Sequence, residues 1–199
     1  CLAGITWIIG LGSPTAHTVD VVGVIFPTIL AALTIIPTYF IGKMLFNRWA
    51  GVFAAGLVAV LPGEFLGRSF LGFTDTHIME TFLTTTFLAF FIAALKTAID
   101  RKMTFNHLKA MDREVIARPL VLSVLAGIFL GLFMITWAGG MLFVFIVTIY
   151  LIVQSVINHL KKKSSEPLTI CSFFLFLPAL IIFLPFSHFR DLNVAMAGI

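Results

Sequence analysis

Charged side chains are scarce in this sequence, and cysteine is scarcer still. Asp, Glu, Lys and Arg together make up 11% of the 199 residues, whereas 60% of the residues are hydrophobic. Soluble domains usually carry about 25% charged residues. The shortage excludes an ordinary soluble fold, because one core could not hide so much apolar surface. The two cysteines, Cys1 and Cys171, lie far apart in apolar surroundings, which excludes a disulfide framework.

Long apolar runs are what the sequence has in abundance. A run of about 17–25 apolar residues is long enough to cross a bilayer as a helix. Six runs predict an all-α, polytopic bundle of transmembrane helices, at residues 21–41, 49–63, 78–98, 120–136, 141–157 and 168–186. The second run is short and rich in Gly and Ala, as is typical of close helix packing. Prolines inside the runs, at Pro27, Pro37 and Pro178, are tolerated in membrane helices.

The 13 Lys and Arg residues are distributed unevenly over the connecting loops. If successive runs cross the bilayer in alternate directions, 11 of the 13 fall on one side, and only Arg68 and Arg190 fall on the other. The positive-inside rule places the rich side in the cytoplasm, so we expect a multi-pass protein of the cell membrane whose loop at residues 62–80 is extracytoplasmic. This distribution explains the net charge of +4 without a nucleic-acid partner. The run Lys161–Lys163 either fixes the topology or binds anionic headgroups.

The outward loop gathers ionisable residues. Five of them occur within 17 positions: Glu64, Arg68, Asp75, His77 and Glu80. In extended backbone, Asp75 and His77 would point to the same side, and a carboxylate with an imidazole suits Mn²⁺ or Zn²⁺ better than an all-oxygen Mg²⁺ site. Glu80 follows His77 by three positions, so on a helix the two share a face. There Glu80 could hold the imidazole in one tautomer behind the metal.

Each of these residues also has a structural explanation. Asp75 or Thr76 could cap the third predicted helix, and Glu80 could sit in its first turn because of the favourable interaction with the helix dipole. Arg68 could anchor the loop at the lipid headgroups. A second outward cluster could likewise cap the first predicted helix, and it consists of His17-Thr18-Val19-Asp20. The spacing Asp-x-His alone therefore leaves both explanations open.

The segment from Pro62 to Glu80 resembles a motif of a known enzyme family. It is similar to the second acidic motif of the oligosaccharyl transferase catalytic subunit in its archaeal (AglB) form. That motif pairs Arg-Ser with Gly-x-x-Asp-x-(Asp/His/Asn) at the outer end of a membrane helix, and Arg68, Asp75 and His77 occupy its positions here. Residues 135–140, Ile-Thr-Trp-Ala-Gly-Gly, resemble the Trp-Gly-Gly hairpin between two later helices of the family.

The resemblance implies a GT-C-like membrane glycosyltransferase that uses lipid-linked sugars. Such enzymes transfer an oligosaccharide from dolichol phosphate or diphosphate to Asn in Asn-x-Ser/Thr. It implies that Asp75 and His77 bind a divalent metal, Mn²⁺ or Mg²⁺ with Zn²⁺ as a third option, and that Asp75 and Arg68 are catalytic. The partners would be a lipid-linked oligosaccharide, an acceptor polypeptide and membrane lipid. The alternatives are a mannosyltransferase-type enzyme that also uses lipid-phosphate sugars and, more remotely, a transporter with ionisable groups near the bilayer midplane.

Three parts that the family needs are not found in this sequence. They are an earlier acidic loop motif, a later loop glutamate that completes the site, and a soluble C-terminal domain that recognises the acceptor. The sequence begins with Cys1 and not Met, and it stops at Ile199 without a terminating signal. We therefore expect residues 1–199 to be an incomplete part of one transmembrane domain, with the soluble C-terminal domain absent, and this piece alone to be inactive.

Overall fold

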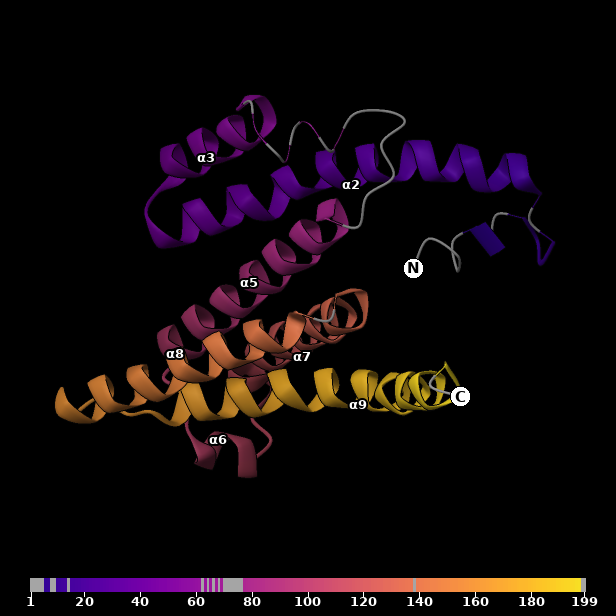
Figure 1. The fold of residues 1–199 in the computed structure, drawn as a ribbon. Helices are drawn as coiled ribbons and strands as arrows, with labels where there is room; N and C mark the ends of the chain where they lie inside the picture. The colour runs from indigo at the N-terminus through magenta and orange to yellow at the C-terminus, as the bar shows by residue number, and fades with distance from the viewer. Residues whose placement is uncertain are drawn as a thin grey trace. The chain divides into compact units, whose positions relative to one another are not determined.

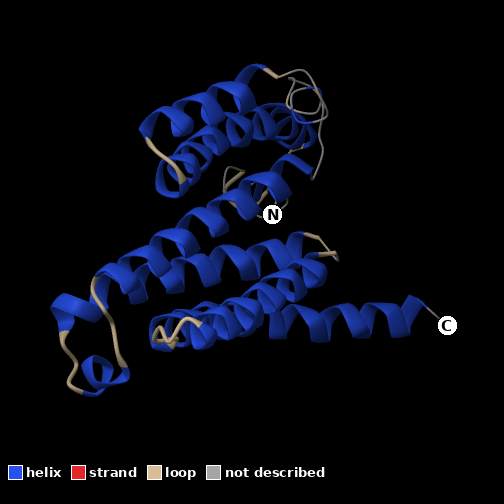
Figure 2. Ribbon diagram, turned by 90° about the vertical axis from the view of Figure 1, so that its left-hand side faces the viewer, coloured by secondary structure: helices blue, strands red, loops and turns tan. Residues whose placement is uncertain are grey.

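The structure is a computed structural model, and every regular element in its described part is a helix (Figure 2). It describes residues 6–7, 10–13, 15–61, 63, 65, 67, 69, 77–137 and 139–197, and for 187–197 the backbone only. The helices are α2 (Ala16–Leu45), α3 (Arg48–Val60), α5 (His77–Asp100), α6 (Phe105–Lys109), α7 (Arg113–Thr136), α8 (Gly140–Leu160) and α9 (Glu166–Ala197) (Figure 1). The predicted all-α class is confirmed.

The first helix begins earlier than its apolar run indicates. α2 starts at Ala16 and not at residue 21, and the hydroxyl of Thr15 caps it by accepting a hydrogen bond from the amide of Thr18 at 3.2 Å. The cluster at residues 17–20 therefore lies inside the helix, and its interpretation as a cap was wrong. Apolar patterning marks only the lipid-facing length of a helix, whereas backbone hydrogen bonds carry the helix further into polar residues.

Five helices have the length and hydropathy to cross a membrane. They are α2, α5, α7, α8 and the part of α9 from Glu166 to Phe186. The range predicted at 49–63 forms α3, which has 13 residues, or about 20 Å at 1.5 Å per residue, against a hydrocarbon core of about 30 Å. The expected six spans thus correspond to five helices of spanning length and one shorter apolar helix. The prolines at 27, 37 and 178 all lie inside helices, as predicted.

The chain divides into two compact units, Cys1–Thr86 and Phe87–Ile199. In the first unit, α2 and α3 lie side by side and are joined by two residues, Phe46 and Asn47 (Figures 1 and 2). The side chain of Asn47 caps α3, because it accepts a hydrogen bond from the Ala50 amide at 2.9 Å. A Cβ at Gly51 would lie 2.6 Å from the carbonyl oxygen of Tyr39. The two backbones approach this closely because glycine has no side chain.

In the second unit, α7 packs along α9, and α8 contacts both. The backbones of α7 and α9 approach each other closely at small residues of α7. A Cβ at Gly127 would collide with the carbonyl oxygen of Leu175, and one at Gly131 would lie 3.0 Å from Cβ of Ile182. The fully or almost fully buried side chains of this interface are Ser123, Ala126, Leu130 and Phe133 on α7, and Cys171, Leu175 and Ala179 on α9.

The Trp-Gly-Gly segment forms the turn between α7 and α8. Trp137 ends α7, and its carbonyl accepts a hydrogen bond from the amide of Gly140, the first residue of α8, at 3.0 Å. A Cβ at Gly139 would lie 2.5 Å from the ring of Trp137. Glycine is therefore required where the indole folds over the turn, which gives a physical reason for this sequence at this position.

One short helix lies between α5 and α7. It is α6, and the carboxylate of Glu166 accepts a hydrogen bond from the amide of Phe105 at 2.8 Å. This bond ties the start of α6 to the first turn of α9. Periodicity could not predict α6, because five residues make little more than one helical turn.

We expect Gly127→Ala to destabilise the protein and Gly56→Ala to leave its stability unchanged or raise it. Alanine at position 127 overpacks the contact with α9, at a cost of about 1–3 kcal/mol. Alanine at position 56 meets nothing within 4 Å, so only its better helix propensity acts, by up to about 1 kcal/mol. Thermal unfolding of both variants in lipid nanodiscs measures the difference. Equal melting temperatures for the two would contradict the packing described for α7 and α9.

Candidate metal centre

The predicted site residues divide into two that the structure describes and two that it does not. His77 is the first residue of α5, and Glu80 lies in the first turn of that helix. Arg68 and Asp75 lie outside the described residues, as do Glu64 and Thr76. The proposed cap of α5 by Asp75 or Thr76 therefore stays a prediction, and so does the pairing of Asp75 with His77.

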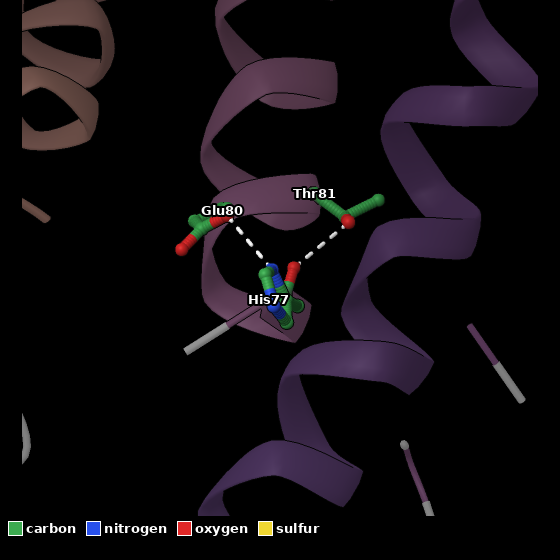
Figure 3. A network of polar contacts seen from close by, with 3 residues as sticks. All are labelled: His77, Glu80 and Thr81. Atoms are coloured by element: carbon green, nitrogen blue, oxygen red, sulfur yellow. Dashed lines mark hydrogen bonds and ion pairs between the residues drawn. The ribbon is translucent and has the colours of Figure 1, made fainter. Parts of the chain in front are cut away.

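His77 and Glu80 contact each other as their spacing predicts. Nδ1 of His77 lies 3.1 Å from Oε2 of Glu80, a separation that helical i,i+3 neighbours reach without distortion (Figure 3). An ionised carboxylate can only accept, so the proton of this bond sits on Nδ1. The contact thereby favours the tautomer in which Nε2 carries the lone pair that binds metals. The side chain of His77 is 52% exposed and that of Glu80 12% exposed.

The first turn of α5 is also fixed through its backbone. The hydroxyl of Thr81 donates a hydrogen bond to the carbonyl of His77 at 2.8 Å (Figure 3). Ile78, the next residue after His77, is 1% exposed and packs in a cluster with Leu30 and Ala31 of α2. The partly buried side chain of Phe65 packs against the same cluster. These contacts hold the helix start in place while the His77 ring stays accessible.

A cavity of about 620 Å³ opens beside His77 within the first unit. Its lining residues come from α2, α3, the following segment and α5: Thr34, Thr38, Leu57, Val58, Leu61, Gly63, Phe65, His77, Ile78, Thr81 and Thr85. The four threonine hydroxyls in this lining each donate to a backbone carbonyl four residues earlier in their own helix. The cavity is consequently apolar in character, and among the described residues that line it His77 is the one ionisable residue.

A hydrogen bond ties the loop before α5 to α2. The hydroxyl of Thr28 donates to the carbonyl oxygen of Ser69 at 2.9 Å, and Ser69 is buried.

The sequence analysis predicted neither this contact nor the cavity. Threonines four positions apart in aliphatic runs, at 34 and 38 and again at 81 and 85, were the available signal for the cavity. The hydrogen bond between Thr28 and Ser69, which are 41 positions apart, has no corresponding pattern in the sequence.

The described residues do not by themselves make a metal site. Among them, no three His, Cys, Asp or Glu side chains lie close enough together to hold a metal ion. The structure thus supplies one imidazole with an oriented ring, and further ligands must come from outside the described residues. An imidazole that donates Nδ1–H to a carboxylate is the usual form of a metal-ligating histidine, and in that respect His77 fits a divalent metal.

Comparison with known proteins decides the family. The family model for the N-terminal part of oligosaccharyl transferase STT3 matches residues 1–199. The chain belongs to this family. The resemblance to this family is thereby confirmed. With its apolar helices, the chain is part of a multi-pass membrane protein of this family.

Similar proteins are archaeal. The chain is 36% identical, over 163 residues and 80% of its length, to the dolichyl-monophosphooligosaccharide–protein glycotransferase AglB of Haloferax volcanii. AglB of Archaeoglobus fulgidus, solved with an inhibitory peptide and dolichol-phosphate, is 29% identical and superposes on 93% of the chain with a TM-score of 0.79. The Archaeoglobus fulgidus oligosaccharyltransferase has also been crystallised with Zn and sulfate; its TM-score is 0.77, with the same identity and coverage.

The STT3-family chain is much shorter than these relatives. It spans 15% of the Haloferax volcanii protein, and 20% and 22% of the two Archaeoglobus fulgidus chains. The comparison with solved structures supports the all-helical fold as well as the family.

Proposed function

We propose that the full-length protein is an oligosaccharyl transferase, which transfers an oligosaccharide from a dolichol-phosphate-type carrier to Asn of Asn-x-Ser/Thr. The observation that carries the proposal is the family match over residues 1–199. The contact that orients the His77 ring supports it. Two relatives support it: one is named for this transfer, and another was solved with dolichol-phosphate and a peptide. On this proposal residues 1–199 form part of one transmembrane domain, and acceptor recognition lies in another part of the protein.

We propose that Asp75 and His77 bind a divalent metal through a carboxylate oxygen and Nε2, respectively. The contact of Nδ1 with Glu80 supports Nε2 as the ligating atom, since it fixes the orientation of the ring. A bound metal would neutralise charge that develops on the departing phosphate. Mn²⁺, Mg²⁺ and Zn²⁺ are the candidates, and a neighbour crystallised with Zn supports a divalent ion.

The residues of the chain then have separate roles. Glu80 orients the His77 ring, and burial of Ile78 fixes the backbone that carries the ring. Arg68 would lie next to the site, as the resemblance implies, and would interact with the phosphate of the donor, because a guanidinium binds phosphate oxygens in a bidentate manner. The half-exposed position of His77 allows a lipid-anchored donor and a soluble acceptor to reach the same point.

We further propose that the loop with Asp75 and His77 faces the extracytoplasmic side and that the Lys- and Arg-rich loops face the cytoplasm. The support is the distribution of basic residues, 11 on one side against 2 on the other. This orientation would let the enzyme act on polypeptides after their translocation across the membrane.

Substitution of the two ligands tests the enzymatic role. In the full-length protein, Asp75→Ala and His77→Ala are expected to lower kcat/KM for a peptide with Asn-Val-Thr by about a hundredfold or more, and Glu80→Ala to weaken Mn²⁺ affinity by about 10–100-fold. Transfer from lipid-linked oligosaccharide is measured over a Mn²⁺ titration, with Mn²⁺ binding followed by electron paramagnetic resonance.

His17→Ala is the matched control, because His17 is an exposed histidine in the first turn of α2 and is absent from the motif. It should transfer at the wild-type rate. If His77→Ala retains the Mn²⁺ dependence and rate of the wild type, the metal role of His77 is wrong.

Cysteine labelling tests the orientation. In a cysteine-free background, Ser13→Cys should react with a membrane-impermeant maleimide on intact cells, whereas Ser164→Cys should react only after permeabilisation. Both serines are exposed; Ser13 precedes α2, and Ser164 follows the run Lys161–Lys163. The opposite pattern of labelling would invert the proposed topology.

A further inference from the structure

The hydroxyl of Thr28 behaves differently from those of most threonines in the described helices. A helical threonine commonly donates to the carbonyl four residues earlier in its own helix. That bond is made by Thr34, Thr38, Thr81, Thr85, Thr97, Thr136, Thr148 and, to the residue before its helix, Thr169. Thr28 instead donates to the carbonyl of Ser69, 41 positions later in the chain.

This contact fastens the loop before α5 to α2. The hydrogen bond is part-buried and 2.9 Å long. Its acceptor is the carbonyl oxygen of Ser69, and Ser69 is buried. The loop backbone at Ser69 is therefore held at one point of α2, and not only by general apolar packing.

A second attachment lies four residues earlier in the same loop. Phe65 packs against the cluster of Leu30, Ala31 and Ile78, which joins α2 to the start of α5. The loop is thus attached at Phe65 by apolar contact and at Ser69 by a hydrogen bond. Arg68 lies between Phe65 and Ser69 in the sequence, and consecutive Cα atoms are about 3.8 Å apart. Arg68 directly precedes Ser69 in the chain.

We propose that Thr28 is a positioning residue, whose hydrogen bond holds the backbone of Ser69 on α2 and so restrains, through the peptide bond, the neighbouring Arg68 of the motif during transfer. The proposal rests on the transferase function and adds to it a residue outside the family motif, on a different helix from His77. Thr28 does not touch the substrate in this account. It acts only through the backbone that carries Arg68.

The test is Thr28→Val in the full-length protein in nanodiscs, because valine keeps the shape of threonine and removes only the hydroxyl. Loss of one hydrogen bond that positions Arg68 is expected to lower kcat about three- to tenfold, with little change in the KM for the Asn-Val-Thr peptide. Thr28→Ser, which retains the donor, should recover most of the rate. Thr148→Val is the matched control, since its hydroxyl serves only its own helix in α8.

A second measurement is independent of activity. Hydrogen exchange followed by mass spectrometry should quicken in peptides from residues 61–76 of Thr28→Val, while α2, α3 and the melting temperature keep their wild-type values. Unchanged kcat and unchanged exchange in this segment, in a preparation whose wild type transfers sugar, would overturn the proposal. So would a uniform rise in exchange with a lower melting temperature, which indicates a general loss of stability.

The exchange measurement also separates this proposal from the transferase function. If the wild type shows no metal-dependent transfer, the proposed function fails, and local exchange at residues 61–76 still decides whether Thr28 holds the loop.

Discussion

Burial of Ile78 against α2 is the contact on which the candidate metal centre depends. Ile78 is 1% exposed and packs against Leu30 and Ala31, whereas the His77 side chain, which contacts Glu80, is 52% exposed. Packing therefore decides how the first turn of α5 is rotated. Successive helical residues project about 100° apart, so a buried Ile78 turns His77 to the side of the helix, where its ring is half-exposed.

The rest of the centre follows from that rotation. Glu80 lies three residues after His77 and reaches Nδ1, and Thr81 reaches the carbonyl of His77. The partner of Ile78 is α2, so the centre also requires that α2 continue as one helix through Pro27 and Pro37. The loop attachment at Thr28 uses the same helix. α2 is thus the surface on which the loop and the start of α5 are placed within the first unit.

Lipid explains how such helices can be arranged with so few polar contacts. In a bilayer, apolar side chains gain little by leaving lipid for another helix, so close backbone approach at small residues holds helices together. Gly51 provides it between α2 and α3, and Gly127 and Gly131 provide it between α7 and α9. Long exposed apolar side chains elsewhere on these helices suit contact with lipid tails or with further helices.

The sequence predicted what depends on local patterns and missed what depends on tertiary contact. Apolar runs located the helices, although the polar first turn of α2 and the whole of α6 carry no apolar pattern. The i,i+3 spacing predicted the contact of His77 with Glu80, because helix geometry alone brings the two together. The Thr28–Ser69 bond joins distant positions, and no local rule finds it. The assignment of Arg68 and Asp75 to the site rests on the resemblance to the family motif, since both residues lie outside the described residues.

The most direct test of the central claim is an anomalous difference map from Mn²⁺-soaked crystals of the full-length protein. The account predicts a peak about 2.0–2.3 Å from Nε2 of His77 and from a carboxylate oxygen of Asp75, with Nδ1 of His77 still in contact with Glu80. A peak bound to Nδ1 with Glu80 displaced, or a peak at a site that does not include His77, would contradict it.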